Sequence, residues 1–159
     1  MNAANDPAAW QNFYIMIGTA NAAITGLLFV ALSLHLKQIL AHPVYKPRAI
    51  LVLIILTTQI VISAIVLSPQ PRVLMGVEVL LLYFFFLALN ARYRESGRLT
   101  ARSALAIAIR VVYLWSAVSL IVGVGGGFYV LGAIITLTIV RSLINCWALL
   151  TALEDEPAA

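Results

Sequence analysis

Five long apolar stretches, separated by short breaks of proline, glycine or basic residues, constrain this chain more than any other feature. They cover residues 13–36, 49–67, 73–91, 103–122 and 128–150. A helix needs about 20 apolar residues to cross about 30 Å of hydrocarbon, and each stretch approaches that length. Lipid offers no hydrogen bonds to an open backbone, so such stretches must be helical. The sequence therefore predicts an all-α, polytopic transmembrane helical bundle of five spans, forming one domain over residues 1–159.

The composition excludes an ordinary soluble domain. Hydrophobic residues make up 63% of the chain and charged residues 10%, against about 45–50% and about 25% in soluble domains. A soluble fold of this size cannot hide so much apolar surface, because small domains leave much of their surface exposed. The formal net charge of +4 comes mainly from short loops between spans. The expected partner is the lipid bilayer, and no nucleic acid is expected.

The breaks between the stretches predict where helices begin and end. Asp6 and Pro7 are typical of an N-cap and a first helical residue. Trp10, Phe13 and Tyr14 follow, as in an interfacial aromatic belt. A polar loop is expected after the first span, up to Arg48.

Later breaks are equally distinct. Two prolines in Ser68-Pro69-Gln70-Pro71-Arg72 predict a tight turn. Residues 92–102 form a basic loop, and the glycines of 123–127 predict a hairpin turn. An acidic tail, residues 154–156, closes the sequence.

Basic residues in the loops predict the orientation. Lys37, Lys46 and Arg48 lie in the first loop, four arginines lie in the third, and the second turn has only Arg72. Because cytoplasmic loops carry the excess of Lys and Arg, the first and third loops are expected in the cytoplasm. The N-terminus is then outside and the C-terminus is cytoplasmic.

Ionisable residues within the spans are candidates for function because hydrocarbon penalises them. Arg141 lies about 15 Å from the cytoplasmic end of its span, where an arginine costs at least about 2.5–3.5 kcal/mol unless it is paired. Glu78 is the only acidic residue within a span. One hypothesis is a Glu78–Arg141 ion pair, extended by Asn145 or Arg110. The alternatives are that Glu78 reaches the outer interface alone and that Arg110 snorkels to the headgroups.

Two further sets of polar or small residues predict contacts between helices. Gln59 is near the middle of its span, where an amide usually bonds another helix. In the first span, a set of small and polar residues falls on one helical face, and small residues allow close helix approach. Packing within the monomer is the favoured explanation, and a subunit interface or a polar pathway is the alternative. This set consists of Gly18, Asn21, Ala22, Thr25 and Gly26.

The sequence lacks the usual signs of an enzyme. His35 and His42 are the only histidines, and no carboxylate or cysteine accompanies them, so no metal site is expected. No HExxH, P-loop or Ser-His-Asp order occurs, and the glycines of 123–127 do not fit GxGxxG. We expect no catalytic residues and no cofactor.

Two segments resemble a known group of proteins. They are TANAAITGLLFVALS at 19–33, preceded by Trp10 and Phe13, and GGGFY at 125–129 followed by LINCWALL at 143–150. Together they resemble small bacterial multi-span integral membrane proteins, some of which are called modulators of the FtsH protease. The resemblance implies a bacterial inner-membrane location and brings no catalytic residues.

Two functional classes remain open from the sequence. The first is a non-enzymatic accessory or scaffold protein, or a modulator of a membrane complex, that packs against a membrane-protein partner or itself. The second is a subunit of a homo-oligomeric channel or transporter. Two arginines against one glutamate within the spans would make such a pathway favour anions.

Overall fold

The computed structural model describes residues 6–41, 43–93 and 101–154, and this part of the chain is helical apart from short turns. Four of the five apolar stretches lie within one long helix each, and the first, 13–36, lies in a long helix up to residue 34 and runs into a short helix that starts at residue 36. The helices are α1 (Pro7–Leu34), α2 (Leu36–Ala41), α3 (Tyr45–Leu67), α4 (Arg72–Tyr93), α5 (Ala101–Val122) and α6 (Gly127–Glu154).

The first helix begins as its sequence predicts. Asp6 is the N-cap of α1, and its side chain accepts a hydrogen bond of 3.1 Å from the backbone N–H of Ala8. Pro7 is at the first helical position, where its missing N–H has no helical partner to lose. The local chemistry of two residues therefore fixes this end of α1.

The loop expected after the first span contains helix α2, so the prediction of a continuous loop is wrong there. Ile39 is buried against a cluster that includes Leu28, Leu32 and Leu56. Leu36 and Leu40, on the same short helix, remain exposed. This segment is therefore helical because Ile39 packs on the bundle. The polar residues around Ile39 had led to the prediction of a loop.

The two other described turns follow their proline and glycine residues. Helix α3 ends at Leu67, and Ser68 adopts an extended backbone. Gly123, Gly125 and Gly126 have φ values of 84°, 93° and 68°, a region that costs glycine little. The hairpin turn predicted at the glycines is confirmed. The third loop at residues 94–100 and the acidic residues Asp155 and Glu156 lie outside the described residues.

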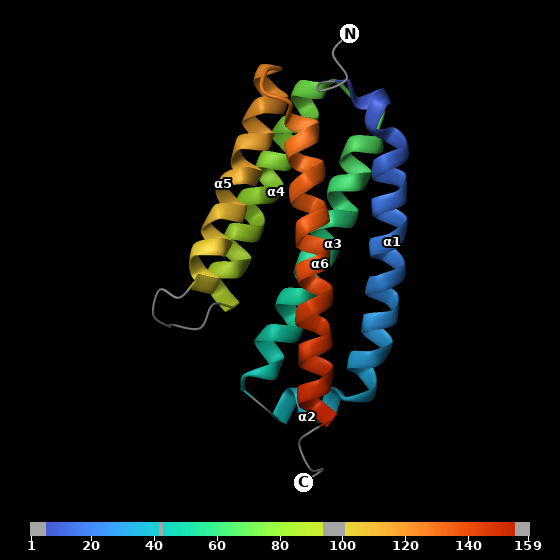
Figure 1. Ribbon diagram of the computed structural model, residues 1–159, viewed down its shortest axis with the longest axis vertical. Helices are drawn as coiled ribbons and strands as arrows, with labels where there is room; N and C mark the ends of the chain where they lie inside the picture. Colours follow the sequence, from blue (N-terminus) through green and yellow to red (C-terminus); the bar gives the residue numbers. More distant parts are fainter. Residues whose placement is uncertain (1–5, 42, 94–100, 155–159) are drawn as a thin grey trace.

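Helices α3 and α6 form the middle of the bundle (Figure 1). Helix α1 packs along α3 and also contacts α6. On the other side, α4 packs against α3 and α5, and α5 packs against α6. Helix α1 begins at the end of the bundle opposite to the end where α6 finishes (Figure 1). The five long helices therefore alternate in direction.

The bundle is held together by two apolar clusters. The larger includes Tyr14, Ile62, Met75, Leu120 and Phe128, and so joins α1, α3, α4, α5 and α6. The smaller joins the ends of α1, α3 and α6 with α2.

The aromatic residues of α1 do more than line a membrane interface. Tyr14 is fully buried, and Trp10 stacks on Phe128 with ring centroids 6.3 Å apart. The rings of Trp10 and Phe13 lie close to the backbone of Gly132, where a Cβ would stand 3.1 Å from Trp10 and 3.3 Å from Phe13. These side chains therefore pack α1 onto α6, which the belt prediction did not include.

Among the residues that the structure describes, four helices are long and apolar enough to span a membrane, which indicates a membrane protein. They are Pro7–Leu34, Tyr45–Leu67, Arg72–Leu89 and Gly127–Ala152. Within the described residues, α5 contributes a shorter apolar segment, Ile107–Val122.

Candidate functional site

Polar side chains from several helices meet at Thr138 in the middle of the bundle. Gln59 is fully buried on α3, and its Nε2 donates a 2.8 Å hydrogen bond to Thr138 Oγ1 on α6. This is the interhelical bond expected of an amide at that depth. Thr138 itself donates to the backbone oxygens of α6 one turn earlier. Tyr113 of α5 is hydrogen-bonded to the same threonine, and Tyr14 of α1 lies within electrostatic reach of Tyr113.

This polar centre retains unused hydrogen-bonding capacity. Four buried side-chain atoms have no hydrogen-bond partner among the described residues: Tyr14 OH, Asn21 Oδ1, Gln59 Oε1 and Ser142 Oγ. Each such atom costs about 1–3 kcal/mol when it is removed from water without a partner. For Gln59, the hydrogen bond made by Nε2 is therefore offset by the unpartnered Oε1. We expect the packing of its side chain to contribute more to the free energy of unfolding than its amide group does.

Gln59→Leu is expected to change the free energy of unfolding by less than about 1.5 kcal/mol, because leucine keeps most of the volume and removes the unpartnered oxygen. Gln59→Ala should cost about 2–5 kcal/mol through the cavity it leaves. Both are measured by SDS titration in mixed micelles. Equal losses in the two variants would show that the hydrogen bond to Thr138 matters more than the packing.

Glu78 accepts a hydrogen bond from the turn between α3 and α4. Gln70 Nε2 donates to Glu78 Oε2 over 2.7 Å and to the backbone oxygen of Ile65 over 3.0 Å. Gln70 was predicted only as part of a turn, and its position between two prolines gave no sign of this contact. Its side chain connects the end of α3 to the first third of α4.

The predicted ion pair between Glu78 and Arg141 is not formed in the described part of the chain. Helix α4 packs against α3 and α5, not along α6. Gly76, close to Glu78, lies against Ala117 of α5. Arg141 is instead level with Arg110 of α5. Arg110 lies seven residues from Ala117, and Glu78 lies two residues from Gly76 in the same direction, which leaves about 7 Å of depth between Glu78 and Arg141.

Arg110 and Arg141 lie at the same level on neighbouring helices. Arg110 is three residues before Tyr113 on α5, and Arg141 is three residues after Thr138 on α6. Tyr113 and Thr138 are hydrogen-bonded to each other, and both arginines lie on the side of this pair where α6 ends. Because α5 and α6 are antiparallel and rise equally per residue, the two arginines are level. Both are half-buried, and neither forms an ion pair with a described residue. Asn145, one turn beyond Arg141, is exposed and does not join them.

The face of α1 that carries Gly18, Asn21, Ala22, Thr25 and Gly26, called the small face below, lies partly against the bundle and partly on the surface. Gly18 packs on α3, where a Cβ would stand 3.0 Å from Ser63 Cβ. Asn21 is fully buried, and Thr25 is half-buried and donates to the backbone oxygen of Asn21 over 2.7 Å.

The rest of this face turns outward. Ala22 is exposed, and nothing lies within 4 Å of a Cβ built on Gly26. A spacing of four residues advances about 40° beyond a full turn. The line of small residues therefore leaves the buried face after Gly18, and packing within one copy accounts for only part of it.

Sequence reasoning missed several members of the polar centre. Ser63 lies one turn from Gln59 and donates to its backbone oxygen over 2.9 Å, and that spacing was a signal. Tyr113 was hidden among apolar neighbours, and Tyr14 was predicted only as part of the aromatic belt. Among the residues that the structure describes, no group of three or more His, Cys, Asp or Glu side chains is placed to hold a metal ion.

Comparison of the chain with protein-family models, with curated proteins and with solved structures finds no match.

Proposed function

We propose that this chain is a multi-pass protein of the bacterial inner membrane whose five long helices all cross the bilayer, with the N-terminus outside and the C-terminus in the cytoplasm. Helix α5 is packed between α4 and α6 and runs antiparallel to both, so it crosses wherever they cross. The basic residues of segments 37–48 and 92–102, which join the long helices at one end of the bundle, support this orientation, because connections rich in Lys and Arg stay in the cytoplasm.

Single cysteines introduced into a Cys146→Ser background test this topology. Lys46→Cys and Arg98→Cys should react with a membrane-impermeant maleimide only from the cytoplasmic side. Val124→Cys, in the exposed turn between α5 and α6, should react only from outside. If Val124→Cys and Arg98→Cys react from the same side, α5 does not cross the bilayer.

Its proposed role is that of a non-enzymatic accessory, scaffold or modulator subunit that packs against a membrane partner through the outward part of the small face. The open space beside Gly26 is the observation that carries this role. Small exposed residues let a second helix approach closely, and such contact drives association where the hydrophobic effect is absent. Ala22 and Ala23 extend the same exposed surface.

Photocrosslinking in intact membranes tests this role. A photoreactive residue at Ala22 or Gly26 should give an adduct with a second membrane protein. The same residue at Leu137, which is exposed on α6, serves as the control and should give none. An adduct between two copies would show self-association, and no adduct from either position would contradict the proposal.

A homo-oligomeric, anion-favouring channel or transporter is the second candidate. The level placement of Arg110 and Arg141, both half-buried and without an ion pair among the described residues, favours it. Chloride flux into liposomes tests it directly. Flux in the unmodified protein that is lost in Arg141→Gln would support a channel, and no flux from a reconstituted oligomer would reject it.

A further inference from the structure

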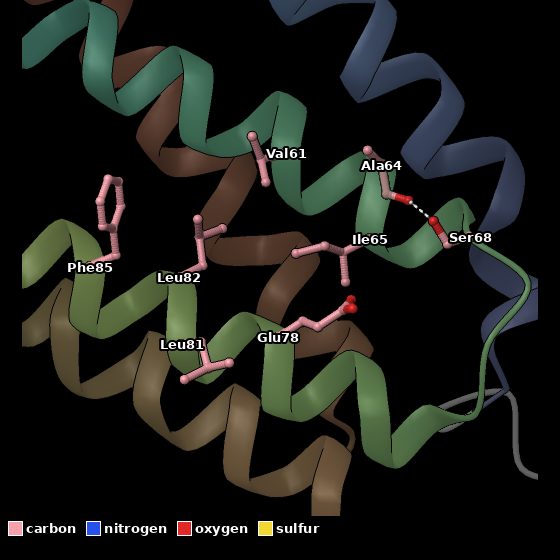
Figure 2. A pocket seen from close by; sticks show the side chains of 8 residues that line it. All are labelled: Val61, Ala64, Ile65, Ser68, Glu78, Leu81, Leu82 and Phe85. Atoms are coloured by element: carbon pink, nitrogen blue, oxygen red, sulfur yellow. Dashed lines mark hydrogen bonds between the residues drawn. The ribbon is translucent and has the colours of Figure 1, made fainter.

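A groove runs between α3 and α4 on the outside of the bundle. It encloses about 480 Å³, within the range of small-ligand sites. Ala64 and Ser68 of α3 and Leu81 and Phe85 of α4 are exposed along it, so it opens toward the surrounding bilayer. Its lining consists of Val61, Ala64, Ile65, Ser68, Glu78, Leu81, Leu82 and Phe85 (Figure 2).

The only charged group in this lining is the carboxylate of Glu78, which projects between the two helices (Figure 2). Gln70 from the α3–α4 turn donates to its Oε2. The other oxygen, Oε1, has no hydrogen-bond partner among the described residues. Glu78 is half-buried, and it forms no ion pair with a described residue. The groove therefore presents one negative group with an unused acceptor at its polar end.

The remaining surface of the groove is apolar. Below Glu78, toward the middle of the bilayer, it continues along Val61, Leu82 and Phe85. Glu78 itself lies about 9 Å from the start of α4, which places it in the outer half of the bilayer in the proposed orientation. A negative group at that depth, above an apolar groove, matches an amphiphile that has a cationic group in its headgroup and a hydrocarbon chain.

We propose that this groove binds a phospholipid with a primary ammonium headgroup, of the phosphatidylethanolamine class. The ammonium donates a charge-assisted hydrogen bond to Glu78 Oε1, and one acyl chain lies along the apolar lining. A trimethylammonium headgroup has no N–H to donate, so phosphatidylcholine gains only the weaker charge attraction. An anionic headgroup without an amine is repelled. The proposal depends on the membrane placement of α3 and α4, but not on the accessory role.

Native mass spectrometry of the delipidated full chain in detergent tests this selectivity. The protein is offered equal amounts of palmitoyl-oleoyl phosphatidylethanolamine and palmitoyl-oleoyl phosphatidylcholine. The unmodified chain should retain the ethanolamine lipid about tenfold more, the difference made by a hydrogen bond to a charged group. Equal retention by the unmodified chain overturns the proposal, whatever the variants do.

Two variants separate the headgroup from the chain. Glu78→Gln keeps an acceptor for Gln70 and the shape of the groove, and should bring the ratio of the two lipids to about one. Ala64→Phe fills the groove from an exposed position and should reduce retention of both lipids. Ala133→Phe, at an exposed position of α6 outside the groove, is the matched control and should change neither. An unchanged ratio in Glu78→Gln contradicts the assignment of Glu78.

Water-soluble ethanolamine distinguishes a lipid site from a site for any amine. It lacks the hydrocarbon chain, so it should fail to displace the bound lipid at millimolar concentration. Displacement would show that the carboxylate takes free amines, and would overturn the lipid assignment. Because this readout is lipid retention, its failure is separate from the failure of the crosslinking experiment.

Discussion

Phe128→Ala is expected to lower the free energy of unfolding by about 3 kcal/mol, at the lower end of the range for a buried phenylalanine. Phe128 is fully buried, and its ring packs against Trp10 and Tyr14 with centroids 6.3 Å away in both cases. The substitution leaves a cavity where α1 meets α6. The loss lies at the lower end because the unfolded side chain stays in detergent, so packing is lost but little transfer to water occurs.

Phe84→Ala is the matched control for this measurement. It removes the same side chain from α4, where 54% of its surface is exposed, so it leaves no enclosed cavity. SDS titration followed by far-ultraviolet circular dichroism measures both variants. Equal losses in Phe128→Ala and Phe84→Ala would show that the aromatic cluster of α1 and α6 does not determine stability.

The sequence predicts the helices well because their ends depend on local chemistry. Asp6 caps α1 through its own side chain, and the glycines after α5 adopt positive φ values that other residues rarely take. Long apolar runs between such signals have only one regular structure available in lipid. Neither inference needs to know which helices are neighbours.

The neighbours themselves are harder to predict, because lipid is as apolar as the buried faces. A soluble helix shows its buried face by its polarity, but a membrane helix has apolar residues on both sides. In α1, Asn21 is buried whereas Ala22 is exposed. On α6, Asn145 faces outward although Ser142 is buried. Polarity alone therefore did not show which way each helix is rotated.

The misplaced ion pair has the same origin. The prediction paired Glu78 with a charged residue on another helix, Arg141. The structure supplies a neutral partner, Gln70, only eight residues away. An amide in a turn satisfies a carboxylate at short range without the cost of burying a second charge.

Gly76→Ile should destabilise the bundle by about 3 kcal/mol, the upper end of the usual cost of overpacking. A Cβ at Gly76 would stand 2.7 Å from a side-chain atom of Ile121, and 3.0 Å from the backbone oxygen of Ala117. The backbone of α5 cannot move aside as a flexible side chain does. Relief therefore requires α4 and α5 to separate, which also disturbs the contact between α4 and α3.

Gly26→Ile provides the comparison, because it adds the same side chain to a helical glycine with nothing within 4 Å. It should leave the unfolding free energy of the isolated protein nearly unchanged, while abolishing the crosslink expected from Ala22. Destabilisation by both substitutions would mean that loss of a glycine, not contact with α5, determines the result. A loss confined to Gly76→Ile would show that close approach of α4 and α5 holds one side of the bundle together. Gly26 on α1 would then not be needed for folding, as expected of a residue that contacts a partner helix.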